Sequence, residues 1–314
     1  MLTIDPKLFH PSAISEETAA FLARLEAQLA DLPATNEMPV EETRAARDAG
    51  QGVFPSGGPL DGSEWRDIPG GRVRISPAPG TPRALYLHIH GGGWALGRPS
   101  HFDKGCQRLA AAAGVTVVSV EYRLAPEHPW PACRDDCLNA ALWLLEHGVA
   151  EFGTDQVLIG GESAGGHLTA VTALALKERG LADRLAGLVL NYGLFDLRLT
   201  GSMRNWGTRK LILNTPVVEW FADMLDPGAA HRGGPGLSPL LADVSDMPPA
   251  LFQIGTADPL LDDTLLMAAH WAGAGNETSL AVYPGGVHAF DAFDLEIARE
   301  YHARLAAFVS GCLR

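Results

Sequence analysis

The chain has 314 residues, of which 46% are hydrophobic and 19% are charged, as is typical of a globular protein with one large core. Its formal net charge is −13, and an acidic surface repels phosphate backbones, so we expect no nucleic-acid partner. No apolar run reaches about 18 residues, so the sequence predicts no membrane span. The N-terminus has no apolar segment behind a basic start, which makes a cytoplasmic protein the default expectation.

The first 60 residues have helical patterns. Ser15 can cap a helix that Pro33 ends, and Pro39 can open a second, shorter helix. Residues 50–62 are rich in glycine and proline, which predicts a loop. The first helix carries one apolar stripe formed by Phe21, Leu22, Leu25, Leu29 and Leu32.

The pattern then changes to strands. Residues 64–68 and 72–76 flank "PGG" and predict a hairpin. Six apolar strands alternating with helical segments follow, which predicts a mostly parallel sheet of eight strands with helices on both faces. Reactive residues belong at the carboxyl ends of such strands. The six segments are residues 84–90, 115–122, 156–161, 185–192, 250–255 and 278–284.

The alternation breaks between Thr200 and Pro239, where an amphipathic segment predicts an inserted helix-loop element. Neither this segment nor the N-terminal helices fit the sheet, so we expect them to pack together as a cap over the strand ends. The expected organisation is N-terminal cap helices in residues 1–60 and a cap insertion in residues 200–238. The core would comprise residues 61–199 and 239–314.

The four cysteines form no CxxC pair. Cys133 and Cys137 stand four residues apart on an expected helix, without further ligands for a metal. We therefore expect no metal site, and free thiols in a reducing compartment. The other two are Cys106 and Cys312.

Ser163 stands between an expected strand and an expected helix in "VLIGGESAGGHLTAV". The pattern Gly-x-Ser-x-Gly in that context predicts a sharp turn that lifts the hydroxyl above the sheet. The amides at the start of the helix can stabilise negative charge there. We therefore predict a nucleophile at Ser163, rather than a serine in an ordinary glycine-rich turn.

A serine nucleophile needs a base, which in this arrangement follows the last strand. His288 stands there, after two glycines. By contrast, His270 and His302 fall in expected helices, and His10 and His101 fall in loops. His288 is therefore the predicted base.

The acid that orients the base has two main candidates, each at the end of a strand. Asp258 follows the strand just before that of the histidine, whereas Asp196 leads into the cap insertion. We predict Asp258, with Asp196 as the alternative. Asp262 and Asp263 are weaker candidates, since acidic residues also suit the first turn of a helix.

The segment "HGGGW" ends the first parallel strand. Acyl transfer needs amide donors aimed at the tetrahedral oxygen, and glycines supply them without obstructing side chains. The predicted donors are Gly92, Gly93 and Ala164. Gly91 is expected to meet a conformational requirement, and His90 to shape the loop through a backbone hydrogen bond.

Together these segments resemble the hormone-sensitive-lipase-like branch of the α/β-hydrolase esterases. The match rests on "HGGGW" at 90–94, "EYRLAPEHPWPA" at 121–132 and "GESAGG" at 161–166, completed by "DPL" at 258–260 and by His288. Members more often have aspartate where Glu162 stands, a difference that keeps the charge.

This resemblance implies an α/β-hydrolase fold with a helical cap. It implies a serine carboxylesterase that hydrolyses small-molecule esters with short to medium acyl chains through an acyl-enzyme, without a cofactor. It also suggests a homodimer. The alternatives are an amidase or formamidase that uses the same triad, and a non-catalytic ligand-binding receptor. Candidates for the pocket wall are Trp94, Phe195, Trp206, Trp220 and Phe221, each of which could equally be ordinary core.

Overall fold

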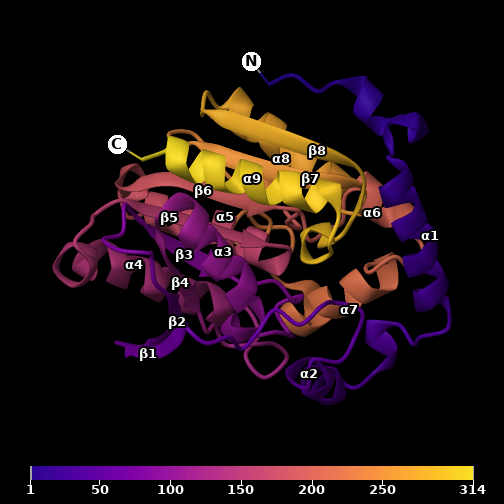
Figure 1. Cartoon of the computed structure of the whole chain (residues 1–314), viewed down its shortest axis with the longest axis horizontal. Coiled ribbons are helices and arrows are strands. Elements are labelled where there is room, and N and C mark those ends of the chain that lie inside the picture. The colour runs from indigo at the N-terminus through magenta and orange to yellow at the C-terminus, as the bar shows by residue number, and fades with distance from the viewer. Residues whose placement is uncertain (1, 314) are drawn as a thin grey trace.

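One sheet of eight strands runs through the computed structural model, which describes residues 2–313 (Figure 1). The strand order is β1-β2-β4-β3-β5-β6-β7-β8. All neighbours pair in parallel except β2, which is antiparallel to both β1 and β4. The predicted α/β class and each predicted strand are therefore confirmed. The strands are β1 Glu64–Ile68, β2 Gly71–Ser76, β3 Leu85–Ile89, β4 Thr116–Val120, β5 Val157–Glu162, β6 Leu185–Asn191, β7 Ala250–Ala257 and β8 Thr278–Val287.

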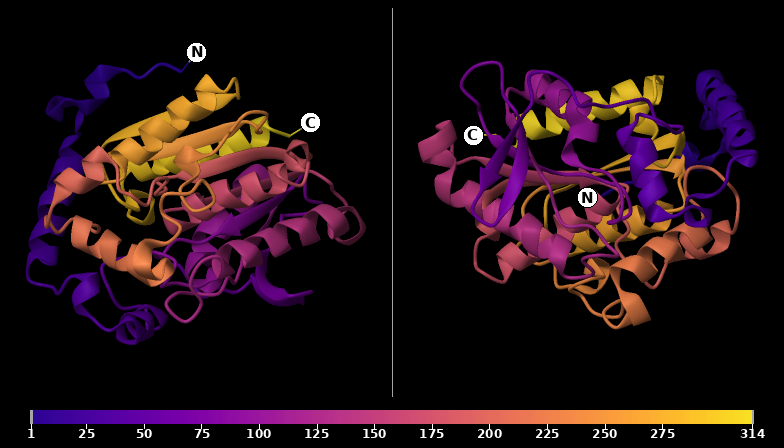
Figure 2. Two further views of the ribbon diagram at one scale, coloured as in Figure 1. Left: turned by 180° about the vertical axis from the view of Figure 1, so that it is seen from behind. Right: turned by 90° about the horizontal axis from the view of Figure 1, so that it is seen from below.

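Helices cover both faces of this sheet, which is why its central strands are mostly apolar. Every residue of β3 and β4 is buried. Helices α3 and α9 cover the face of the sheet that is nearer the viewer in Figure 1. Helices α4, α5 and α8 cover the other face (Figure 2). The bounds of these helices are α3 Asp103–Ala113, α4 Ala132–Phe152, α5 Ala164–Lys177, α8 Leu261–Gly273 and α9 Glu296–Gly311.

The remaining helices lie together along one side of the sheet (Figure 1). Two come from the N-terminal segment and two from the insertion after β6. The carboxylate of Glu26 accepts two hydrogen bonds from Arg209, at 2.7 and 2.9 Å, and Lys210 donates to the carbonyl of Leu32 at 2.7 Å. The two segments therefore contact each other directly. Their helices are α1 Glu16–Ala30, α2 Val40–Asp48, α6 Gly201–Trp206 and α7 Thr215–Leu225.

The first helix follows its predicted pattern with one exception. The hydroxyl of Ser15 caps α1 by accepting a hydrogen bond from the amide of Thr18 at 3.2 Å. Leu25 is buried against the core, and three neighbours in the stripe are partly buried with it. The prediction that Leu32 belongs to this stripe is wrong: α1 ends at Ala30, so the side chain of Leu32 leaves the apolar face and is 43% exposed.

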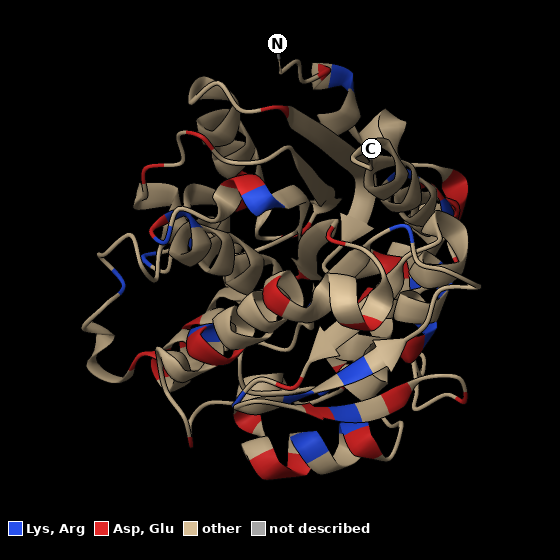
Figure 3. Ribbon diagram, turned by 90° about the vertical axis from the view of Figure 1, so that its left-hand side faces the viewer, with Lys and Arg blue, Asp and Glu red and all other residues tan. Residues whose placement is uncertain are grey.

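The acidic net charge is distributed rather than concentrated. In the view of Figure 3, acidic positions are spread over many helices and loops, with basic positions interspersed. Within residues 2–313, no helix has both the length and the apolar character needed to cross a bilayer. The same residues contain no cluster of three or more potential ligands for a metal, and the four cysteines are free thiols.

Candidate active site

Ser163 lies at the turn between β5 and α5. Its backbone has φ 57° and ψ −121°, a combination that an L-residue adopts only in a strongly constrained turn. The turn is possible because Gly161 and Gly165 lie directly against the carbonyl of Ile89, where any side chain would collide with that oxygen. Strand and helix thus approach closely, and the Ser163 amide donates to the carbonyl of Asn191 at 2.9 Å.

His288 and Asp258 lie beside the hydroxyl of Ser163, although all three are far apart in the chain. Nε2 of His288 is 2.7 Å from Oγ of Ser163, and its Nδ1 is 2.8 Å from Oδ2 of Asp258. Both residues are buried, and Oδ1 of Asp258 accepts a hydrogen bond from the amide of Leu260 at 2.9 Å. The geometry forms a continuous chain of hydrogen bonds from hydroxyl to carboxylate.

The alternative acids are engaged elsewhere. Asp196 pairs with Arg198 at 2.7 Å and also accepts from that residue's amide. Asp263 accepts hydrogen bonds from the amides of Phe195 and Asp196 and from the hydroxyl of Thr200, so it supports the chain as it leaves β6. Burial raises the pKa of Asp263 to about 7. None of these contacts reaches the imidazole of His288.

Three backbone amides near the nucleophile, those of the predicted oxyanion donors, have no acceptor among the described residues. Within residues 2–313, the amides of Gly92, Gly93 and Ala164 donate to no other group of the protein. Gly92 has φ 128° and Gly93 has φ 58°, values that favour glycine. These free amides are the predicted oxyanion donors. Gly91 differs from them, because its amide donates to Oε1 of Glu162 at 2.8 Å.

Glu162 has a position that the sequence did not reveal. Its Oε2 lies 3.1 Å from Nε2 of His88, and Nδ1 of His88 lies 2.7 Å from the hydroxyl of Ser119. Burial opposes charge on His88, yet Cys106 and Glu162 raise its pKa well above the usual range, which favours a charged pair. The residue before the nucleophile is thus joined to the glycine loop and to two strands. Its place in "GESAGG" was the only available signal.

His90 shapes the glycine loop as expected. Its Nδ1 is 2.9 Å from the carbonyl of Gly91, and its ring stacks on Tyr122 with a centroid distance of 4.2 Å. Burial lowers the pKa of His90 to about 3, so the ring is neutral near pH 7. A neutral, stacked imidazole suits a structural role in the loop.

A second carboxylate lies near the histidine and was not predicted. The ring of Tyr192 meets the His288 ring edge to face at 5.0 Å, and its hydroxyl donates to Oδ1 of Asp291 at 2.5 Å. Burial raises the pKa of Asp291 to about 6. Asp291 lies only three residues after His288, but nothing in the sequence indicated that its side chain turns toward Tyr192.

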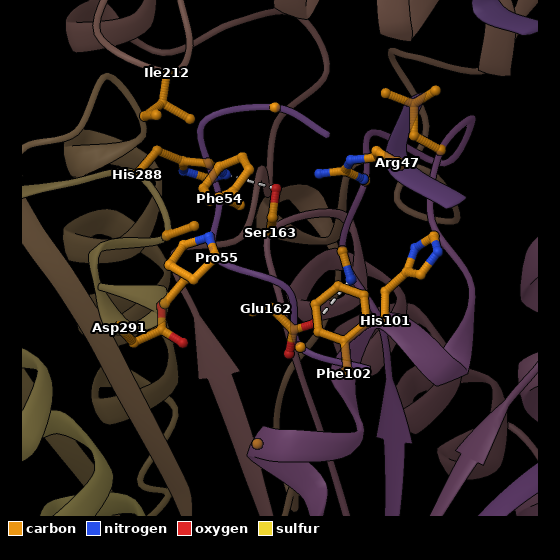
Figure 4. Close-up of a pocket in the computed structure, with 18 of the residues that line it drawn as sticks. Arg47, Phe54, Pro55, His101, Phe102, Glu162, Ser163, Ile212, His288 and Asp291 are labelled. Carbon is orange, nitrogen blue, oxygen red and sulfur yellow. Dashed lines mark hydrogen bonds between the residues drawn. The ribbon is translucent and has the colours of Figure 1, made fainter. Parts of the chain in front are cut away.

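A cavity of about 650 Å³ reaches the serine hydroxyl (Figure 4). The core contributes Ser163 and His288, the N-terminal segment contributes Arg47 and Phe54, and the insertion contributes Phe221. Phe221 is therefore the one member of the predicted aromatic set that lines this cavity. Trp94 and Phe195 are buried in the core instead, and Trp206 and Trp220 are partly buried against it.

Comparisons with known proteins identify the family of this chain. The family model described as the α/β hydrolase fold matches residues 86–292. Ethyl acetate hydrolase of Pseudomonas putida is 38% identical over 218 residues, which cover 68% of this chain and 67% of that protein.

Solved structures of an esterase and of a lipase are also similar to this chain. A hyperthermophilic esterase of the archaeon Pyrobaculum calidifontis has a TM-score of 0.83 at 31% identity, with 99% of both chains covered. A hormone-sensitive lipase from a metagenome library has a TM-score of 0.85 at 30% identity, covering 95% of this chain and 98% of its own. The chain therefore belongs to the α/β-hydrolase family, within its hormone-sensitive-lipase-like branch. It is an enzyme of the carboxylic ester hydrolase class.

Proposed function

We propose that the protein is a serine carboxylesterase that hydrolyses small-molecule esters with short to medium acyl chains through an acyl-enzyme. The observation that carries this proposal is the hydrogen-bonded sequence Ser163–His288–Asp258, with distances of 2.7 and 2.8 Å, beside three free amides. The ethyl acetate hydrolase relative acts on a short-chain ester, as its name says, which supports the substrate class.

In the proposed mechanism, Oγ of Ser163 attacks the ester carbonyl while Nε2 of His288 accepts its proton. Asp258 keeps Nδ1 of His288 protonated and stabilises the imidazolium. The amides of Gly92, Gly93 and Ala164 hold the oxyanion of the tetrahedral intermediate. His288 then gives its proton to the departing alcohol, and water attacks the acyl-enzyme by the reverse sequence of proton transfers.

The substrate is proposed to enter beneath a cap formed by residues 1–60 and 200–238, with residues 61–199 and 239–314 as the catalytic core. The contacts of Arg209 with Glu26 and of Lys210 with the Leu32 carbonyl support a joint cap. Phe221 packs against Gly93, which would bring a cap residue close to the reacting carbonyl. A homodimer and a cytoplasmic location stay predictions.

A rate panel of aryl esters with increasing acyl length tests the proposal. Turnover should be greatest with short to medium chains, and Ser163→Ala should abolish nearly all of it without unfolding the protein. A serine-directed phosphonate should label the native protein and not the variant. Full turnover by Ser163→Ala would overturn the mechanism. Faster hydrolysis of an amide than of its matching ester would favour the amidase instead, and failure to label would favour the receptor.

A further inference from the structure

Arg47 is a cation in the cavity that contains the nucleophile. It belongs to the last turn of α2 and is partly buried. Figure 4 shows its guanidinium directed inward, toward the same space as the hydroxyl of Ser163. The proposed reaction uses no group at this place, so the cation has no role in the chemistry described above.

Within the described residues 2–313, the guanidinium of Arg47 also has no hydrogen-bonding or ion-pair partner. Among residues 2–313, no carboxylate or carbonyl accepts a hydrogen bond from it, and the ring of Phe54 lies 5.8 Å from Cζ. Its neighbour in the same helix differs: Arg44 is bidentate to Glu127, at 2.6 and 2.9 Å, and donates to the carbonyl of Ala95. Arg98, likewise close to the glycine loop, pairs with Asp48 at 3.0 Å.

The carboxylates that border the cavity are occupied or exposed. Glu162 is held by the Gly91 amide and His88, and Asp291 accepts from Tyr192. Glu42, near the start of α2, is exposed to solvent. Burial lowers the pKa of Arg47, and only the phenol of Tyr122 opposes that effect. A partly desolvated cation without a counterion is costly, so this position favours the arrival of an anion.

The position of Arg47 places that anion next to the reacting ester. A methyl group built on Gly92 would lie 3.2 Å from Nη1 of Arg47, and one built on Gly97 would lie 3.5 Å away. Gly92 is one of the predicted oxyanion donors. A carboxylate on the ester whose carbonyl meets Ser163 could therefore reach the guanidinium. Arginine suits a carboxylate, since its planar fork can donate two parallel hydrogen bonds.

We propose that Arg47 binds a carboxylate carried by the substrate, so that the enzyme prefers esters with a free acidic group over neutral esters of the same shape. This inference rests on the proposed esterase function. In this proposal Arg47 determines substrate specificity: it positions the substrate by binding the substrate's carboxylate, and it takes no part in proton transfer.

Matched pairs of esters test the proposal. Monoethyl succinate is compared with ethyl isocaproate, in which an isopropyl group replaces the carboxylate on the acyl side. Meta-acetoxybenzoate is compared with meta-isopropylphenyl acetate, which makes the same replacement on the alcohol side. The readout is the ratio of kcat/KM for the acidic ester to that for its neutral partner. Arg47→Gln should lower this ratio about 10- to 100-fold for at least one pair, and that pair identifies the side that carries the carboxylate.

Two further variants control for charge and for folding. Arg24→Gln removes the same charge from an exposed position in α1 and should leave the ratio unchanged. Arg47→Lys keeps a cation and should retain more of the ratio than Arg47→Gln, with thermal unfolding followed for all three.

The outcomes separate the inference from the function. If Arg47→Gln leaves the kcat/KM ratio unchanged for both pairs, whether or not it slows all four esters, the carboxylate site is wrong while the esterase stands. If the native protein hydrolyses none of the four esters and the phosphonate does not label Ser163, the esterase function itself fails.

Discussion

Oε1 of Glu162 accepts a hydrogen bond from the amide of Gly91 at 2.8 Å, which ties the residue before the nucleophile to the loop that carries two predicted oxyanion donors. Glu162→Ala should therefore lower kcat about 10- to 100-fold with little change in KM, because misplaced donors weaken only the transition state. Glu162→Gln keeps an acceptor for the amide and should lose less. Steady-state kinetics on one neutral aryl ester measures both.

The matched control for that variant is Glu146→Ala, at an exposed position of α4. Its kinetics should equal those of the native protein. A rise in KM with unchanged kcat in Glu162→Ala would contradict a role in positioning the loop.

The two candidate acids can be separated by a pair of isosteric changes. Asp258→Asn should reduce kcat about ten-thousandfold, since an amide cannot hold the required tautomer of His288 or stabilise its charged form. Asp196→Asn breaks the contact with Arg198 and should alter stability while leaving kcat within about threefold. The opposite ranking in a pre-steady-state acylation assay would reassign the acid.

Phe221 should limit the acyl group that the cavity accepts. Its ring packs on Gly93, where an added side chain would collide with it. Phe221→Leu should raise the kcat/KM of a branched acyl ester relative to the acetyl ester by about tenfold. Phe195→Leu is the matched control, since that ring is fully buried in the core and does not line the cavity. An equal change in both variants would show a general packing effect.

Asp263 should make stability depend on pH. Burial raises its folded-state pKa to about 7, above the ordinary value of 3.8. Between those values the folded state binds more protons than the unfolded state, so the free energy of unfolding should fall as pH rises from about 4 to about 7. The contribution is at most about 4 kcal/mol.

Urea unfolding of the native protein and of Asp263→Asn across this range measures that contribution. The variant does not titrate at this position, so the native protein should lose stability relative to it as pH rises. If the native protein instead gains stability relative to Asp263→Asn as pH rises, the Phe195 and Asp196 amides and the Thr200 hydroxyl hold the carboxylate charged.

The features that the sequence predicted well are those fixed by local patterns. The strand before Ser163 and the helix after it follow from an apolar run and a glycine-rich turn, so neither depends on distant contacts. His288 and Asp258 could be selected because parallel strands bring their carboxyl ends to one edge of the sheet. Their roles in catalysis stay predictions until the variants are measured.

The features that were missed depend on packing between segments. Arg47 faces the cavity only because α2 folds back over the glycine loop, and no periodicity in residues 39–48 distinguishes it from the paired Arg44. The carboxylate of Asp291 turns toward Tyr192, 99 residues earlier in the chain. Among the aromatic candidates, Trp94 and Phe195 pack in the core and do not line the cavity. The sequence alone does not show whether an aromatic ring will face the core or the cavity.

The lining of the cavity includes side chains from three parts of the chain: Arg47 and Phe54 precede the sheet, Phe221 lies in α7 between β6 and β7, and Ser163 and His288 follow the ends of strands. Mutations in the first two stretches can alter which molecules are accepted without disturbing the atoms that would break the bond. Directed evolution aimed at new substrates should therefore concentrate its libraries in those two stretches.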